Sequence, residues 1–155
     1  MYELKPLEDV PHALLMAQMT DPRVTEHLPL LTGGFDASAL DQFLTLKAER
    51  WAKDGLGHWG IWQDGVYLGW GGFEKEGDVW DFGLVLTPEA FGHGLTITRQ
   101  ALSFAQDEAW ISRVQFLLAP SRRNVRALLR IGAQEVGEVR YGGQTFRRFL
   151  LDTRA

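Results

Sequence analysis

The sequence contains no cysteine, which excludes disulfides, thiolate metal sites and a cysteine nucleophile. Its four histidines include no pair at metal-ligand spacing, so we expect no metal centre. It has no basic-then-apolar leader and no apolar run long enough to cross a membrane, so the expected location is the cytoplasm. It also has no excess of positive charge. The formal net charge of −4 gives no reason to expect a nucleic-acid partner.

The bulk composition is that of a globular protein. Of the 155 residues, 45% are apolar and 23% are charged, which is enough to build a sizeable core. We find no repeat, low-complexity tract or linker, so residues 1–155 are expected to form a single domain. A mildly acidic surface suits a cationic partner such as an amine.

Hydrophobic periodicity predicts the element order β-α-α-β-β-β-α-β-α-β-β. Strands are expected at 2–6, 58–63, 66–73, 79–86 and 114–118, with two more between 135 and 152. Asp64-Gly65, Gly77-Asp78 and Gly142-Gly143 are read as the turns between strands. The expected fold is therefore α/β (α+β), with helices packed on a mixed sheet.

Four helices are expected. The first runs from about Val10 to Met19 behind an Asp9 cap, and an irregular connection around Val24–Leu30 follows it. The second begins at Asp36 or Ser38, buries a stripe from Leu40 to Trp51 and ends before Gly55. The third follows a glycine turn, and the fourth runs from Arg122 to Ile131 and is ended by Gly132. The inward positions of the third helix are expected to be Leu95, Thr98, Leu102, Ala105 and Ala109.

The stretch from Leu84 to Thr96 connects an apolar strand to the third helix through Pro88, Gly92 and Gly94. These glycines can take backbone angles closed to other residues and leave room for a ligand against the main chain. The first turn of the helix offers unpaired N–H groups at the positive end of its dipole. The pattern indicates a phosphate site, although an ordinary strand-to-helix connection contains the same residues.

Three segments together resemble the GNAT superfamily of N-acetyltransferases, most closely its ribosomal-protein-alanine N-acetyltransferase branch. Phe82–Gly94 resembles I-G-Y-x-L-x-P-E-Y-W-G-K-G, and Ser121–Ala133 resembles N-x-x-S-x-R-A-L-E-x-L-G-A. The opening Leu4–Asp9 resembles L-R-P-x-x-x-x-D, so the likeness covers nearly the whole chain. It implies the GNAT fold, with a mainly antiparallel twisted sheet of about seven strands.

The resemblance also implies acetyl-CoA as the acyl donor and a primary amine as the acceptor. In that family the fourth strand holds the pantetheine arm through its main chain, and turn amides hold the pyrophosphate. The residues at these positions are Leu84, Val85, Leu86, Phe91, Gly92, His93, Gly94, Leu95 and Thr96. Asn124 is a further candidate contact to the pantetheine.

The sequence departs from the family pattern at three places. Glu89 stands where the wider superfamily prefers Arg or Gln. The family's N-x-x-S is inverted to Ser121-x-x-Asn124. The tyrosine that protonates the leaving thiolate in many members is replaced here by Leu128, whose side chain has no ionisable proton. The resemblance therefore implies cofactor binding, and it assigns no general acid.

Three residues are candidates for catalysis. Asp81 lies on the opposite side of the fourth strand from Trp80 and Phe82, close to the expected thioester, and a carboxylate there can accept a proton from an attacking amine. Its alternative interpretation is a solvent-facing strand residue. Glu26 lies in the connection that borders the acceptor site in this family, and it can equally be a surface charge. Ser121 can contact the thiolate or only cap its helix.

The sequence leaves the acceptor open between a protein N-terminus and a small amine. It also leaves open a non-catalytic acyl-CoA-binding or regulatory protein on the same scaffold, because fold does not fix function. The side chain of His93 is expected to face solvent or the cofactor's phosphates. Arg122, Arg126 and Arg130 are expected to form a helix stripe that faces solvent or a phosphate. The oligomeric state is expected to be monomer or homodimer.

Overall fold

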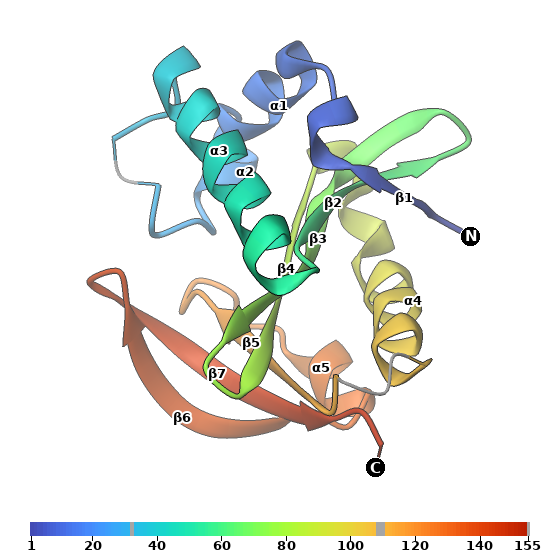
Figure 1. Cartoon of the computed structure of the whole chain (residues 1–155). Coiled ribbons are helices and arrows are strands. Elements are labelled where there is room, and N and C mark those ends of the chain that lie inside the picture. Colours follow the sequence, from blue (N-terminus) through green and yellow to red (C-terminus); the bar gives the residue numbers. More distant parts are fainter. Residues whose placement is uncertain (32, 108–110, 155) are drawn as a thin grey trace.

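The protein is described by a computed structural model that covers residues 1–31, 33–107 and 111–154. A seven-stranded sheet crosses the molecule in the order β1-β2-β3-β4-β5-β7-β6 (Figure 1). Only the β4–β5 pairing is parallel, and the other five neighbouring pairs are antiparallel. The strands are β1 (Glu3–Pro6), β2 (His58–Gln63), β3 (Val66–Glu76), β4 (Val79–Leu86), β5 (Arg113–Leu118), β6 (Gln134–Tyr141) and β7 (Gln144–Asp152).

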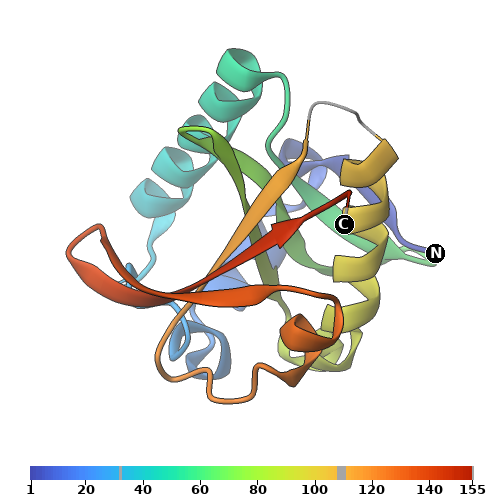
Figure 2. The same cartoon turned by 90° about the horizontal axis from the view of Figure 1, so that it is seen from below.

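The helices divide between the two faces of the sheet (Figures 1 and 2). One face carries α1 (His12–Met19), α2 (Pro22–Thr25) and α3 (Ala37–Asp54), and its core joins Leu15 and Leu40 to Trp70 of β3. The other face carries α4 (Gly94–Asp107), whose Ala101 and Ala105 pack on Phe82. The short α5 (Arg126–Arg130) follows β5. No helix among the described residues is both long enough and apolar enough to cross a membrane.

The predicted order and number of strands are confirmed, and so are most turns. Asp64 and Gly65, with φ angles of 52° and 77°, form the β2–β3 turn. Positive φ at both central residues matches the twist of a two-residue hairpin, and Gly tolerates it without strain. Asp36 caps α3 by accepting a hydrogen bond from the Ala39 N–H, and Gly55 ends that helix in the left-handed conformation.

Four local predictions are wrong. Asp9 does not cap α1, because it ends a 3₁₀ turn, Leu7–Asp9, and Pro11 precedes the helix. The connection after α1 contains α2, a single turn that Asp21 caps. The helix expected over 122–131 is only five residues long, so Arg122 lies outside it and the three arginines form no continuous stripe. In α3, Ala48 is exposed although it belongs to the predicted stripe.

Helix α4 buries a different set of residues from the predicted one. Thr98 and Ala105 are buried as expected, but Leu95 and Leu102 are only half-buried, and Ile97 and Ala101 take inward positions instead. Ala109 lies outside the described residues. The hydrophobic stripe is therefore rotated by part of a turn from the one that periodicity alone predicts.

Candidate active site

Strands β4 and β5 begin side by side and then separate. Their register contains only two pairs, Trp80 with Val114 and Asp81 with Gln115. Strand β4 continues from Phe82 to Leu86 while still paired to β3 on its other edge, so its β5-facing edge has no strand partner there. Free main-chain groups along a strand edge can bind an extended ligand. The predicted pantetheine segment, Leu84–Leu86, lies in this unpaired part.

A pocket of about 30 Å³ lies at the separated strands. Its lining joins Leu84, Val85 and Leu86 to Phe91 from the turn and to His27 and Arg122 from two loops. A volume of this size holds no more than a few water molecules. The Val85 carbonyl moreover already accepts a hydrogen bond from Gln18 Nε2 at 2.8 Å. A long ligand therefore requires the loops around this pocket to move apart.

The glycine turn differs from its prediction in conformation. Pro88–His93 is a 3₁₀ helix that leads directly into α4, and Gly94 has φ −55° and ψ −47°, which are ordinary helical angles. Gly92 is not among the residues with positive φ either. The reason these positions suit glycine is space: a Cβ on Gly92 meets nothing within 4 Å, and one on Gly94 meets only Leu86 Cδ1 at 3.7 Å. Both glycines leave the main chain open to a ligand.

The side chain of His93 lies against Tyr2. Its Nδ1 lies 2.8 Å from the Tyr2 hydroxyl, and the two rings meet edge to face with centroids 5.7 Å apart. The imidazole is half-buried beside Tyr2, which directly precedes β1, so only part of the ring is open to solvent. The reason is that the last turn of the 3₁₀ helix points this position back toward the first strand. The main chain of His93 remains a candidate for phosphate binding.

Asp81 lies where the two strands separate. Its Oδ1 accepts a hydrogen bond from Gln115 Nε2 at 3.2 Å, and Gln115 Oε1 in turn accepts one from Arg148 Nε at 2.9 Å. Burial raises the pKa of the Asp81 carboxyl to about 7, against the lowering effect of the Gln115 hydrogen bond. Glu76 and Glu74 raise this pKa further, and Lys47 lowers it. A carboxyl with such a pKa can accept a proton near neutral pH.

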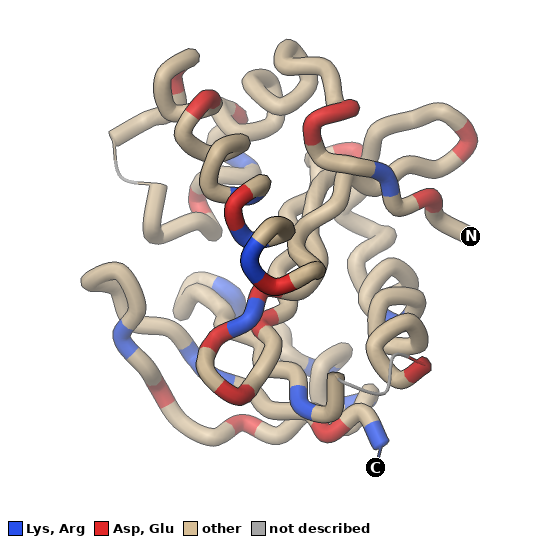
Figure 3. The backbone as a smooth tube through the Cα atoms, in the orientation of Figure 1, with Lys and Arg blue, Asp and Glu red and all other residues tan. Residues whose placement is uncertain are grey.

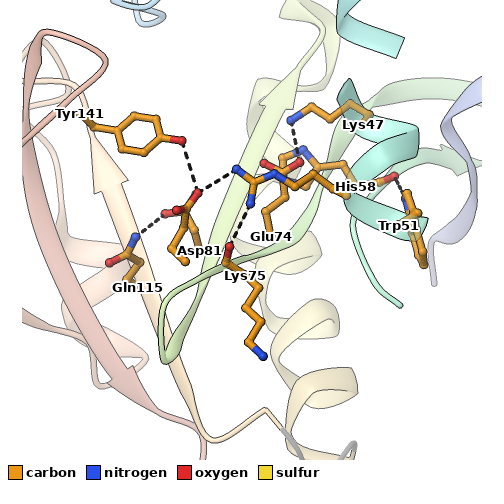
Figure 4. Close-up of polar contacts among 10 residues, drawn as sticks. Lys47, Trp51, His58, Glu74, Lys75, Asp81, Gln115 and Tyr141 are labelled. Carbon is orange, nitrogen blue, oxygen red and sulfur yellow. Dashed lines mark hydrogen bonds and ion pairs between the residues drawn. The ribbon is translucent and has the colours of Figure 1, made fainter. Parts of the chain in front are cut away.

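Side chains from α3 and β3 surround Asp81 on one face of the sheet (Figure 4). Lys47 Nζ lies 3.1 Å from Glu74 Oε2, and Arg50 pairs with Glu76 at the same distance. The Tyr141 hydroxyl, from the end of β6, donates to Glu76 Oε1 at 3.3 Å. In Figure 3 the basic positions of α3 and the acidic positions at the end of β3 lie next to each other. Two acid–base pairs, Lys47–Glu74 and Arg50–Glu76, therefore lie near the candidate base.

Two residues of this cluster were missed by sequence reasoning. Lys47 is 16% exposed at its side chain although lysine normally reaches solvent. A signal existed, because position 47 lies between Phe43 and Trp51 at helical spacing on the buried stripe. His58 is fully buried, and neither of its ring nitrogens has a hydrogen-bond partner. Burial therefore holds its pKa well below the usual value and keeps the ring neutral.

His58 fits against β4 because Gly83 has no side chain. A Cβ at Gly83 would lie 3.2 Å from His58 Cε1. The imidazole also packs on Trp70 with ring centroids 5.5 Å apart, and its Nε2 lies 3.8 Å from Glu74 Oε1. No sequence pattern brings these positions together. They meet because β2, β3 and β4 are neighbours in the sheet.

The structure joins Glu26 and Ser121 through a histidine. His27 Nε2 lies 3.1 Å from Glu26 Oε1, and His27 Nδ1 lies 2.9 Å from Ser121 Oγ. Ser121 lies five residues before α5 and does not cap it, so that alternative is wrong. Asn124 Oδ1 instead accepts from the Arg126 N–H at the start of the helix. Among the three catalytic candidates, Glu26 and Ser121 therefore both contact His27, Ser121 through a hydrogen bond, while Asp81 belongs to a separate group of contacts.

Solved structures share this architecture. The aminoglycoside acetyltransferase AAC(6')-Ib in complex with coenzyme A superposes with a TM-score of 0.77 at 16% identity, over 99% of this chain and 95% of that one. An acetyltransferase from Agrobacterium tumefaciens gives a TM-score of 0.76 at 16% identity, with 97% and 90% of the chains covered. Spermidine N-acetyltransferase from Vibrio cholerae, in complex with CoA and spermine, gives 0.75 at 11% identity, with 99% and 95% covered.

This chain has the GNAT acetyltransferase fold. The likeness extends over whole chains at low identity, so it concerns the GNAT architecture and not a particular branch. No protein-family model and no curated protein matches the sequence. The closer resemblance to ribosomal-protein-alanine N-acetyltransferases therefore stays a prediction. Among the described residues, no three His, Asp or Glu side chains converge in a way that could hold a metal ion.

Proposed function

We propose that this protein is an acetyl-CoA-dependent N-acetyltransferase in which a primary amine attacks the thioester directly. The observation that carries the proposal is the position of Asp81. In a chain with the GNAT fold, Asp81 is a half-buried carboxyl with a pKa of about 7 at the point where β4 and β5 separate. A general base whose pKa lies near the working pH combines a useful ionised fraction with enough basicity to accept a proton.

The donor site that supports this proposal is mostly main chain. The edge of Leu84–Leu86 would hold the pantetheine arm, and the amides from Phe91 to Thr96 would hold the pyrophosphate at the start of α4. Two exposed loops border the entrance, and they are tied by the His27–Ser121 hydrogen bond. Binding of acetyl-CoA would exchange that contact for contacts to the ligand.

In the proposed reaction the protonated amine first releases one proton to solvent. The neutral nitrogen then forms a bond to the acetyl carbon while its second proton passes to Asp81. The carbon–sulfur bond then breaks, the amide forms, and the CoA thiolate leaves and takes a proton. Leu128 cannot supply that proton. We assign the role to the Ser121 hydroxyl, which His27 can recharge through their hydrogen bond. Glu26 would orient His27 from its other ring nitrogen.

For the acceptor we propose a small cationic amine in preference to a protein N-terminus. Glu74 and Glu76 lie on the same sheet face as Asp81 and attract a positively charged ligand. Solved structures with this fold hold such ligands: AAC(6')-Ib with ribostamycin, and spermidine N-acetyltransferase with spermine. The overall charge of −4 acts in the same direction.

Calorimetry with acetyl-CoA tests the donor. Binding in the micromolar range is expected, and no heat at high micromolar concentration would overturn the proposal. Turnover is then followed as free thiol released with two acceptor panels, one of polyamines and aminoglycosides and one of short peptides with free N-termini. Turnover of the first panel alone supports a small amine, and turnover of the second alone overturns it. Binding without any turnover would favour a regulatory acyl-CoA-binding protein.

A further inference from the structure

Three carboxyl groups share one face of the sheet next to each other. Glu74 on β3 is directly opposite Asp81 on β4, and Glu76 lies two residues further along β3. Directly opposed residues of antiparallel strands have Cβ atoms about 5 Å apart, and like charges at that separation repel each other. The ionised form of Asp81 is therefore opposed by its neighbours unless cations offset them.

The more buried of the two cations that pair with this row is Lys47. Lys47 Nζ is 3.1 Å from Glu74 Oε2, and these side chains are only 16% and 13% exposed. The same ammonium lies 5.1 Å from the Trp70 ring centroid and 5.5 Å from that of Phe43, both within cation–π range. Because the pair is shielded from water, its charges act on Asp81 with little screening.

The other groups that face Asp81 are an amide, a more exposed ion pair with a tyrosine, and a neutral imidazole. Gln115 on β5 donates a hydrogen bond to it, and Arg148 on β7 is engaged with Gln115. Arg50 and Tyr141 both contact Glu76, and the Arg50–Glu76 pair is about one-third exposed, so water screens it more. His58 on β2 is neutral. The Lys47–Glu74 pair is thus the most buried ion pair beside the candidate base.

We propose that the Lys47–Glu74 ion pair tunes the proton affinity of the buried Asp81 in two opposite directions, Glu74 raising it and Lys47 lowering it. Both are then positioning residues for the reaction, because they act on it through Asp81. The inference deepens the proposed function, on which it rests only for the role of Asp81 as the base. The proton affinity itself is a property of the free protein and can be measured without any substrate.

The experiment follows the Asp81 carboxyl carbon by NMR through a pH titration of the free, full-length protein. Lys47→Met is expected to raise the Asp81 midpoint and Glu74→Gln to lower it, each by about one pH unit. The double variant is expected to return close to wild type, because both charges are gone. Lys53→Met, the same change at an exposed position of α3, serves as the matched control and should leave the midpoint in place.

Opposite shifts that cancel cannot come from a general loosening of the site. A shift of the Asp81 midpoint in the same direction in both single variants would overturn the proposal. An unchanged midpoint in both would overturn it as well. Lys47→Met leaves Glu74 buried without its partner and can fail to fold. In that case the comparison of Glu74→Gln with the double variant isolates Lys47, and an unchanged midpoint between those two overturns the proposal as well.

Kinetics separate this inference from the proposed function. If the protein acetylates amines, the acidic limb of kcat/KM against pH should move with the NMR midpoint in each variant. If the midpoints shift as expected but no variant turns over any amine, the proposed function fails and the ion-pair proposal stands. If turnover occurs and neither the NMR midpoint nor the acidic limb moves in the variants, the ion-pair proposal fails and the acetyltransferase stands. If the midpoints shift but the acidic limb stays in place, the ion-pair proposal stands and Asp81 is not the base.

Discussion

The donor side and the acceptor side of the candidate site are built in different ways. On the donor side the groups are main-chain atoms of β4, of the 3₁₀ helix at Pro88–His93 and of the start of α4, all contiguous in sequence. On the acceptor side the groups are side chains that come from α3, β3, β4, β5 and the end of β6. A contiguous main-chain site leaves a local sequence motif, whereas a site assembled across strands leaves none. The following predictions test this contrast, from the largest effect to the smallest.

Asp81→Asn should lower kcat/KM for the best acceptor by about 10²- to 10⁴-fold, since it removes the proposed general base but keeps the shape. Acetyl-CoA affinity by calorimetry should not change, because the donor side has no contact that this substitution removes. Asp78→Asn, the same change on the exposed β3–β4 turn, is the control. Near-wild-type activity of Asp81→Asn would remove Asp81 from the mechanism and leave the donor side as described.

Gly94→Val should weaken acetyl-CoA binding by about 10- to 100-fold, because losing one charge-assisted hydrogen bond to phosphate costs roughly 1.5–3 kcal/mol. The fold should persist, since the new Cβ meets only Leu86 Cδ1 at 3.7 Å. Calorimetry and far-UV circular dichroism measure the two effects. Ser103→Val, on the exposed side of the same helix, controls for the helix propensity of valine. Wild-type affinity in Gly94→Val would place the phosphates elsewhere.

The Asp81 carboxyl should cost stability as the pH rises. Its folded pKa of about 7 lies above the ordinary value of 3.8, so the folded state binds more protons between these pH values. Stability is then fully present below about pH 4 and falls as the pH rises toward 7. At pH 8, Asp81→Asn should therefore have a free energy of unfolding higher than wild type by on the order of 1–3 kcal/mol. Its unfolding temperature should be higher as well. The two proteins should match at pH 4, and equal stability at both pH values would contradict the raised pKa.

Tyr141→Phe should have the smallest effect. It removes a hydrogen bond of 3.3 Å from an exposed tyrosine to Glu76, and a net hydrogen bond of this kind is worth about 1 kcal/mol or less. We expect at most a few-fold rise in the KM for the amine and no change in the KM for acetyl-CoA. A change confined to acetyl-CoA would assign the β6–β7 hairpin to the donor side.

Much of the fold was predictable because it depends on short-range patterns. Alternation in Val79–Leu86, the Asp64-Gly65 turn and the caps at Asp36 and Gly55 each depend on residues close in sequence. The errors arose where two local solutions compete. Pro11 displaced Asp9 as the cap of α1, and the segment after Asn124 supported only one helical turn and a half. Local propensity did not decide between them.

The candidate site divides along the same line. Leu84–Thr96 could be proposed as the donor segment from sequence because strand, turn and helix follow one another in the chain. In the structure its glycines leave space and have no unusual angles. Asp81 was predictable as a face residue of β4. Its raised pKa was not, because the burial and the carboxyls that cause it come from other elements.

The sequence by itself therefore determined the element order, the strand-turn-helix segment proposed for the donor and the face of β4 that carries Asp81, since each follows from residues within a few positions of one another. Only the tertiary structure decided that β4 separates from β5 at Asp81, that Lys47 is buried against Glu74, and that His58 lies on Gly83. These contacts join residues 25 to 34 positions apart. They depend on strand order and packing, and these arise only when the whole sheet has formed.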